Sequence, residues 1–455
     1  MQAAYDALHA LLGERFTTGA SDRALHGQSE SHFADMPPDG VAYPQTTAEV
    51  AALVSICAAH GLPVIGWGTG TSLEGHALAP HGGITVDFSR MNAVLQVSAD
   101  DMLAVVQPGV TREALNTELR ATGLFFPVDP GANASLGGMA STRASGTTAV
   151  RYGTMRSNVL ALEVVLADGR IVRTGTRAPK SSTGYDLTGL FVGAEGTLGL
   201  ITELTLRLQG QPDGISAAVC AFDDMDAATQ TVIMTIQSGI PMARIEFIDA
   251  TFVRIFNARH GTDMPEKPHL MVEFHGTPQG VREQAESFGN IVADMGGSAF
   301  QWAEQAQDRA RLWSMRHNAY YAARAAWPDA YAITTDVCVP ISKLAQAVRE
   351  TADDIAASGI PGPILGHVGD GNFHVLLLPH RDDPAQMAKA AALAHAMADR
   401  ALRLGGTVSG EHGIGMGKLR YMDREHGAGW DVMTSLKAAL DPHGIMNPGK
   451  LLRQP

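Results

Sequence analysis

The sequence predicts an α+β protein with two lobes, and three features of the chain support this. Segments with strand-like and helix-like patterns follow one another without the regular alternation of a doubly wound sheet. Residues 209–215, QGQPDGI, have the composition of a linker. Three glycine-rich loops lie before that linker. With 455 residues, the chain is long enough for about three domains or two large ones.

The composition excludes several classes of function. The 34 Lys and Arg against 47 Asp and Glu give a net charge of −13, which disfavours a nucleic-acid or anionic-lipid partner. No apolar run approaches the ~20 residues of a transmembrane segment, and the N-terminus lacks the pattern of a signal peptide. Cys57, Cys220 and Cys338 form no CxxC pair, which excludes a cysteine zinc site and predicts three buried thiols in a reducing compartment. We expect a cytoplasmic protein, and attachment to the inner face of the membrane stays open.

The first lobe is expected to start with an amphipathic helix, because apolar residues recur at Leu8, Leu11, Leu12 and Phe16. Thr46 or Thr47 is expected to cap a second helix that runs to about His60. The remaining elements are strands at 62–65, 83–88, 103–107 and 198–208, a helix at 111–122 with Gly123 as its C-cap, and a hairpin of 160–166 and 170–174.

The second lobe is expected to alternate strands with Ala-rich helices. The strands are predicted at 217–222, 244–249, 269–274, 363–367 and 373–378, and the helices at 225–238, 279–294, 303–325, 342–357, 383–404 and 428–440. We predict domains of 1–210 and 211–440, followed by a C-terminal segment, 441–455.

The three glycine-rich loops, 66–75, 130–146 and 193–199, have the chemistry that pyrophosphate binding needs. Glycines let backbone N–H groups approach an anion, and Thr and Ser add hydroxyl donors. The first loop is not a Rossmann motif, because Thr71 stands where GxGxxG requires Gly, and no Gly-Lys-Ser/Thr follows as in a P-loop. Tight turns are the alternative interpretation, and three such loops in one lobe weaken it.

The segments PVIGWGTGTSLEG, PGANASLGGMASTRASGTTAVRYG and GAEGTLGLIT resemble the FAD-binding domain of the vanillyl-alcohol oxidase type. In that family the first loop wraps the pyrophosphate, the second follows the ribityl chain and flavin, and the third approaches the adenine. The resemblance implies FAD contacts from Gly68, Thr69, Gly70, Thr71, Ser72, Pro130, Gly138, Thr142, Ser145, Gly146, Gly196 and Ile201. Thr71 stands at the position where some members attach the flavin covalently to a His, so we expect non-covalent FAD.

A second motif, GHVGDGNFH, carries His367 and His374 on either side of a Gly-Asp-Gly turn. The turn can fold the two imidazoles toward one point. Glu411, in the glycine-rich SGEHGIG, is the candidate third ligand, because two histidines and one carboxylate are a usual catalytic metal set. His412 would then be free to act as a base. A hairpin with two hydrogen-bonded histidines is the alternative.

Arg316, in LWSMRHN, lies on an apolar helix face with Leu312, Met315 and Ala319. A guanidinium there needs an anion, and its geometry suits a carboxylate. An arginine that extends to solvent from the apolar face is an equally good interpretation of the spacing alone.

WSMRHNA, GHVGDGNFH, SGEHGIGMGK and LDPHGIMNPGK closely resemble the flavin-linked D-lactate dehydrogenases, a group that includes glycolate oxidase subunits and D-2-hydroxyglutarate dehydrogenases. The resemblance spans about 35–453. It implies an FAD-binding domain and a substrate, or cap, domain with an antiparallel sheet covered by helices. It also implies that His367, His374 and Glu411 bind zinc or manganese, that His412 is the base, that Arg316 holds the substrate carboxylate, and that Asn447 returns to the flavin.

Two departures from the 2-hydroxyglutarate enzymes favour D-lactate. Thr334 stands in place of a Lys that reaches the distal carboxylate, and Leu376 stands in place of an Asn. We expect Ala319, Ala322 and Ala323 to leave room for longer aliphatic acids. Glycolate and 2-hydroxyglutarate remain the alternatives within the class, and a metallohydrolase or a flavin-storage protein outside it. The electron acceptor, whether cytochrome c, quinone, an electron-transfer flavoprotein or oxygen, stays open, as does a homodimer.

Overall fold

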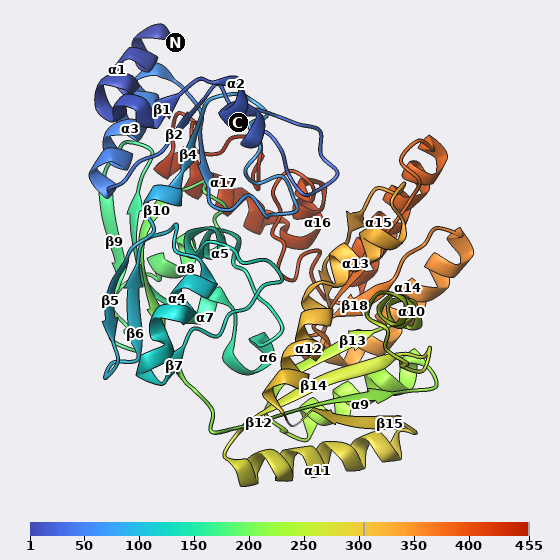
Figure 1. The fold of residues 1–455 in the computed structure, drawn as a ribbon. Coiled ribbons are helices and arrows are strands. Elements are labelled where there is room, and N and C mark those ends of the chain that lie inside the picture. Colours follow the sequence, from blue (N-terminus) through green and yellow to red (C-terminus); the bar gives the residue numbers. More distant parts are fainter. Residues whose placement is uncertain (304, 454–455) are drawn as a thin grey trace. The chain divides into compact units, whose positions relative to one another are not determined.

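The computed structural model describes residues 1–303 and 305–453, without the side chains of residues 299 and 300. The chain forms two compact units (Figure 1). Unit 1 comprises residues 1–145, 153–211 and 411–455, and unit 2 comprises residues 146–152 and 212–410. A short piece of the second glycine-rich loop therefore belongs to unit 2. The predicted ranges of an FAD-binding domain (1–210), a substrate domain (211–440) and a C-terminal segment (441–455) stay a prediction.

Unit 1 is built on a small mixed sheet and a larger antiparallel one. The mixed sheet has the order β1 (Phe16–Thr17), β2 (Gly40–Ala42), β4 (Ile84–Asp87), β3 (Val64–Trp67), and β2, β4 and β3 are parallel. The antiparallel sheet has the order β5 (Val94–Ser98), β6 (Leu103–Val106), β10 (Leu200–Arg207), β8 (Val159–Val165), β9 (Ile171–Gly175). A short ladder pairs β7 (Leu124–Phe125) with β11 (Gln209–Gly210).

One helix of unit 1 begins and ends where the local sequence predicts. The hydroxyl of Thr46 accepts the N–H of Glu49 at the start of α3 (Thr47–His60), and Gly61 ends the helix in the left-handed conformation. Its buried residues, Val50, Leu53, Val54 and Cys57, recur at helical spacing and pack against the mixed sheet. The other helices are α1 (Gln2–Leu12), α2 (Ala20–Leu25), α4 (Arg112–Glu118), α5 (Leu136–Thr142), α7 (Met155–Asn158), α8 (Leu187–Phe191), α16 (Met422–His426) and α17 (Ala428–Leu440).

Unit 2 is an antiparallel sheet covered by helices, as predicted. Its strands run in the order β15 (Ser298–Ala303), β12 (Gly214–Ala221), β14 (His269–Gly276), β13 (Met242–Ile248), β18 (Ile364–Gly366), β19 (Asn372–Leu377), β16 (Ile333–Thr334), with β17 (Val337–Cys338) paired to β19. One apolar cluster joins the sheet to α9 (Met225–Gln237), α11 (Pro278–Asp294), α14 (Leu344–Ser358) and α15 (Pro384–Arg403). A second cluster, on the other face, involves α10 (Ala250–His260), α12 (Ala306–His317) and α13 (Ala319–Ala326). The short α6 (Ala149–Tyr152) packs on β13.

Three expectations from the sequence need correction. The single helix expected at 303–325 is wrong, since Ala303 ends β15 and Asn318 separates α12 from α13 (residue 304 lies outside the described part). A periodic apolar pattern cannot show such a one-residue break. The helix expected at 111–122 becomes a 3₁₀ turn after Glu118. Cys338 is only half-buried, whereas Cys57 and Cys220 are buried, and all three thiols are free.

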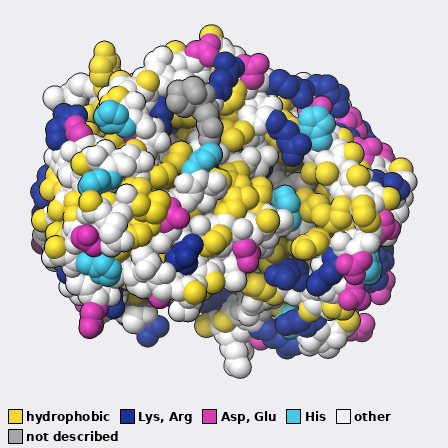
Figure 2. Space-filling model, turned by 90° about the horizontal axis from the view of Figure 1, so that it is seen from above, with side chains coloured by type: hydrophobic (Ala, Val, Ile, Leu, Met, Phe, Trp, Pro, Cys, Tyr) yellow, Lys and Arg dark blue, Asp and Glu magenta, His cyan; other side chains and the backbone are white. Residues whose placement is uncertain are grey.

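On the face drawn in Figure 2, Lys and Arg side chains are interspersed with Asp and Glu. Within the described ranges, no helix combines the length and the apolar character needed to cross a membrane.

A buried histidine in unit 1 makes stability depend on pH. The His26 ring packs on Trp67, with Nδ1 2.8 Å from the Asp22 carbonyl and Nε2 2.9 Å from Asp87 Oδ2. Because both partners are acceptors, both ring nitrogens donate and the ring is protonated. Burial alone would lower the pKa of His26, but these hydrogen bonds and the charges of Asp87 and Asp22 outweigh it and raise the pKa.

Replacing His26 with Gln is expected to lower the free energy of unfolding by roughly 1–3 kcal/mol in mildly acidic buffer. A raised folded pKa contributes stability that is complete below the unfolded value of about 6.5 and is lost as pH rises through the folded value. The gap in urea midpoint between wild type and His26→Gln should therefore narrow with rising pH. A gap that stays constant from acidic to alkaline buffer would contradict the protonated ring.

Candidate active site

The first glycine-rich loop follows β3 and packs tightly against the second. A Cβ atom at Gly68 would collide with Ser135 Oγ and would lie 3.9 Å from Gly138 Cα. Gly70 has a φ of +72°, which an L side chain adopts only with strain. The hydroxyls of Thr69 and Thr71 lie 3.3 Å apart. Gly68 is thus required by the close approach of the second loop, and Gly70 by its backbone conformation.

The other predicted cofactor contacts are distributed over both units. Unit 1 holds Gly68, Thr69, Gly70, Thr71, Ser72, Pro130, Gly138, Thr142, Ser145, Gly196, Ile201 and Asn447, and unit 2 holds Gly146. The Ser135 hydroxyl is buried and has no hydrogen-bond partner among the described residues, and the same holds for Nδ1 of His76, which directly follows the first loop. Buried polar atoms without partners are costly, so a ligand with polar oxygens would satisfy them.

Asn447 joins the C-terminal segment to two of these loops. Its side-chain amide donates to the carbonyls of His76 (3.1 Å) and Glu195 (2.7 Å), and its oxygen accepts from Lys450 Nζ (2.6 Å). Burial lowers the pKa of Lys450 to about 7, although the charge of Glu195 raises it. Both amide donors of Asn447 are used within the chain, so we expect this residue to serve the cofactor by holding the loops together.

The segment that carries Glu411 and His412 is anchored in unit 1 by buried carboxylates. Glu195 accepts the N–H groups of Ile414 (2.7 Å) and Gly415 (2.8 Å), and Lys418 Nζ lies 3.3 Å from Glu74 Oε1. Burial would raise the pKa of Glu195, but the charge of His76 and these hydrogen bonds hold it below its ordinary value.

In unit 2, the Gly-Asp-Gly turn brings His367 and His374 together as predicted. Strands β18 and β19 pair antiparallel, with Leu365 opposite His374. Gly371 has a φ of +79°, and a Cβ there would collide with the Val339 carbonyl. The centroids of the two imidazole rings lie 5.3 Å apart, and the ring planes are nearly perpendicular. A non-glycine residue at 371 would therefore disturb the hairpin that brings the rings together.

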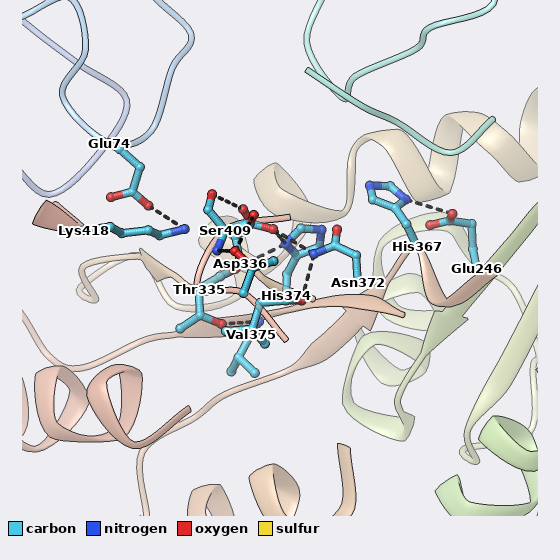
Figure 3. A network of polar contacts seen from close by, with 12 residues as sticks. Glu74, Glu246, Thr335, Asp336, His367, Asn372, His374, Val375, Ser409 and Lys418 are labelled. Atoms are coloured by element: carbon cyan, nitrogen blue, oxygen red, sulfur yellow. Dashed lines mark hydrogen bonds and ion pairs between the residues drawn. The ribbon is translucent and has the colours of Figure 1, made fainter. Parts of the chain in front are cut away.

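Each of the two histidines is held through Nδ1. His367 Nδ1 lies 2.8 Å from Glu246 Oε1, and His374 Nδ1 lies 3.2 Å from the Thr335 carbonyl (Figure 3). Both partners are acceptors, so Nδ1 carries the hydrogen and a neutral ring offers its lone pair at Nε2. Histidines that bind a metal usually donate the other ring N–H to a carboxylate or a carbonyl in this way.

Arg316 does not extend to solvent; it is buried on α12, and its Nη2 lies 2.6 Å from Glu246 Oε2. The contact is an ion pair without hydrogen-bond alignment, and Arg316 Nε has no hydrogen-bond partner among the described residues. The prediction that this guanidinium needs an anion is confirmed, but the anion in the structure is a carboxylate of the chain. The remaining N–H is available to a second anion.

Asp336 organises the polar surroundings of His374. Its carboxylate accepts from Asn372 Nδ2 (2.8 Å) and Ser409 Oγ (2.9 Å), and Oδ1 lies 3.6 Å from His374 Nδ1 (Figure 3). Gly410 packs on Asn372 so closely that a Cβ would collide with the amide. Glu411 and His412 follow Gly410 directly in the chain, as the first residues of the last segment of unit 1.

Sequence reasoning missed Glu246 and did not give Asp336 a role. A signal for Glu246 was present, because it is an acidic residue between the apolar residues Ile245 and Phe247 of a strand. A buried carboxylate at such a position requires a partner.

Comparison with known proteins decides the family. Residues 38–175 match a family model described as an FAD binding domain, and residues 211–451 match one described as the C-terminal domain of FAD linked oxidases. The chain belongs to the FAD-linked oxidase family. The resemblance identified from the glycine-rich loops is thus confirmed, and the unpartnered Ser135 hydroxyl and His76 nitrogen fit a cofactor with polar oxygens.

The relatives of this FAD-linked oxidoreductase cover nearly the whole chain. A protein of Danio rerio named probable D-lactate dehydrogenase, mitochondrial, is 48% identical over 96% of this chain and 89% of its own length. A D-lactate dehydrogenase [cytochrome] of Arabidopsis thaliana is 42% identical over 98% of this chain and 79% of its own. A glycolate oxidase subunit of Bacillus subtilis is 33% identical over 96% and 94%.

Solved structures confirm the fold of this family member. A p-cresol methylhydroxylase superposes with a TM-score of 0.81 at 17% identity, covering 99% of this chain and 96% of its own. A 4-ethylphenol oxidase of Gulosibacter chungangensis gives 0.80 at 18% identity, covering 100% and 97%. The fold is of the vanillyl-alcohol oxidase type, as the glycine-rich loops led us to expect.

Proposed function

We propose that this FAD-linked oxidoreductase oxidises a D-2-hydroxy acid, D-lactate above others, to the 2-keto acid. The observation that carries the proposal is the arrangement in unit 2. Buried Arg316, whose Nε–H has no hydrogen-bond partner among the described residues, contacts the Glu246 carboxylate. The same carboxylate contacts His367, and the ring of His374 lies beside that of His367. That arrangement offers one group for a substrate carboxylate and two metal ligands. The names of the relatives agree with it.

Each residue of the site has a proposed role. His367, His374 and Glu411 would hold zinc or manganese, and the Nδ1 contacts of the two histidines fit such a metal. Arg316 would bind the substrate carboxylate, and His412 would take the hydroxyl proton. Bound FAD would supply the hydride acceptor, and the metal would supply Lewis acidity at the hydroxyl. The loops with Gly68, Thr69, Gly70, Thr71, Ser72, Pro130, Gly138, Thr142, Ser145, Gly146, Gly196, Ile201 and Asn447 would hold FAD without a covalent bond.

The preference for a small substrate is supported by Thr334 and Leu376, which are opposite each other in the ladder of β16 and β19. Neither carries a charge for a distal carboxylate, and Leu376 is buried in an apolar cluster. Ala319, Ala322 and Ala323 are at most 2% exposed and lie within the same cluster, and their leaving room for longer acids stays a prediction.

The electron acceptor and the second candidate substrate follow from the names of relatives. The word cytochrome in the name of a relative favours a cytochrome acceptor over a quinone or an electron-transfer flavoprotein. Glycolate is the second candidate substrate, because one relative is a glycolate oxidase subunit. The metallohydrolase alternative is not favoured, since a hydrolase does not need an FAD-binding domain. We keep a cytoplasmic location and a homodimer as predictions.

The function is tested by dye-linked turnover of a panel of D- and L-2-hydroxy acids. We expect kcat/KM for D-lactate to exceed that for L-lactate and for D-2-hydroxyglutarate by on the order of 10²-fold or more, since an unpaired second carboxylate is costly to bury. Arg316→Met should raise KM for D-lactate strongly, because the carboxylate loses its cation. Preference for an L-acid, or an Arg316→Met variant with wild-type KM, would contradict the proposal.

A further inference from the structure

We infer that Glu246 is a positioning residue that holds the metal ligand His367 and the substrate-binding Arg316 in fixed register. This inference rests on the function proposed above and deepens it. One carboxylate spans the two groups, since Oε1 lies 2.8 Å from His367 Nδ1 and Oε2 lies 2.6 Å from Arg316 Nη2. The two contacts come from different parts of the unit, one from the turn after β18 and one from α12.

The place of Glu246 in the fold is unusual for a charged residue. It lies in the middle of β13, fully buried, and its neighbours Ile245 and Phe247 point into the apolar cluster on the opposite face of the sheet. A buried carboxylate without strong partners would be heavily destabilising. The strand, which is held by β14 and β18 on its two sides, is also one of the most rigid supports available to a side chain.

The substrate chemistry gives a reason for such a link. In a 2-hydroxy acid, the carboxylate and the hydroxyl are on adjacent carbons, so the groups that bind them must keep a fixed separation. A single side chain that contacts both His367 and Arg316 ties that separation to one rigid strand. It also fixes the tautomer of His367, because the carboxylate accepts the hydrogen from Nδ1 and leaves Nε2 for the metal.

The neighbouring strand provides a matched control. Glu273 on β14 lies on the same face of the sheet and is also buried, at 5% exposure. Its carboxylate lies 2.8 Å from His275 Nε2 and 3.4 Å from Arg244 Nη1, and it accepts from Trp313. Within the described part of the chain, neither His367 nor Arg316 forms a hydrogen bond or ion pair with Glu273. Replacing Glu273 with Gln thus removes a buried carboxylate from the same face of the sheet and leaves the contacts of Glu246 with His367 and Arg316 in place.

The experiment titrates zinc and, separately, manganese into FAD-loaded full-length protein against a competing fluorescent chelator, without substrate. Wild type, Glu246→Gln and Glu273→Gln are compared. We expect Glu246→Gln to weaken metal binding by about 10- to 100-fold, and Glu273→Gln to stay within about threefold of wild type, since its contacts do not include the metal histidine. With metal saturating, KM for D-lactate should rise in Glu246→Gln more than in Glu273→Gln, because the orientation of Arg316 is lost as well.

The outcomes separate this inference from the proposed function. Equal metal affinity of wild type and Glu246→Gln overturns the inference. An equal loss of metal affinity in Glu246→Gln and Glu273→Gln also overturns it, because that result would indicate that removing any buried carboxylate from this face of the sheet weakens metal binding. A wild-type protein that binds neither metal overturns the proposed metal set instead. If Glu246→Gln does not yield folded, flavin-containing protein, Glu246→Asp is titrated in its place. That variant keeps the charge but draws it back by one methylene, and the same weakening is expected.

Discussion

Replacing His412 with Ala is expected to lower kcat for D-lactate oxidation by on the order of 10²- to 10⁴-fold. The reason is that oxidation of a secondary alcohol requires loss of the hydroxyl proton, and His412 is the proposed acceptor. The direct measurement is the rate at which D-lactate bleaches the oxidised-flavin absorbance under anaerobic conditions, since this step excludes the unknown electron acceptor. The flavin and metal content of the variant should match those of wild type.

His443→Ala is the matched control, because His443 is an exposed histidine of the same unit. We expect it to bleach flavin at the wild-type rate. Added imidazole should restore part of the rate in His412→Ala, since a small base can enter the space that the side chain leaves. Undiminished bleaching by His412→Ala would show that another group takes the proton.

Removal of the metal is expected to lower turnover by on the order of 10²-fold or more, because the hydroxyl then loses its Lewis acid. Dialysis against a chelator, followed by addition of zinc or manganese, should abolish and restore activity, and the restoring ion identifies the metal. His374→Ala should have the same low activity but should not respond to added metal.

The control for this second experiment is His395→Ala, since His395 is half-exposed on α15 of the same unit and is not one of the proposed metal ligands. Its metal content and activity should equal those of wild type. Full activity in protein that elemental analysis shows to be free of metal would contradict the proposed role of His367, His374 and Glu411.

Much of the fold follows from local sequence signals. The helix predicted to start at a cap on Thr46 or Thr47 and to run to about His60 is α3, because its ends depend on hydrogen bonds within a few positions. The hairpin that brings His367 to His374 was also predictable, because glycine in the turn is needed for a positive φ. The break at Asn318 was not, since the apolar pattern continues through it.

The candidate site shows the same division. The need of Arg316 for an anion could be read from its place on an apolar helix face, but not the identity of that anion. Glu246 and Arg316 are far apart in the sequence, and only the tertiary fold brings Glu246 Oε2 to 2.6 Å from Arg316 Nη2. Likewise, the burial of Ala319, Ala322 and Ala323 depends on residues of other elements, which a local pattern cannot report.

The sequence by itself determined the FAD-linked family, through the three glycine-rich loops and the motifs of the second lobe, because motifs record which residue types must be present. The tertiary structure decided which side chains contact these residues and fix their orientation. It placed one carboxylate between His367 and Arg316, and it tied Asn447 to two loops through its amide. These contacts join segments that are far apart in the chain. Burial and hydrogen bonding between such segments stabilise them, and the sequence of one segment does not show its partner.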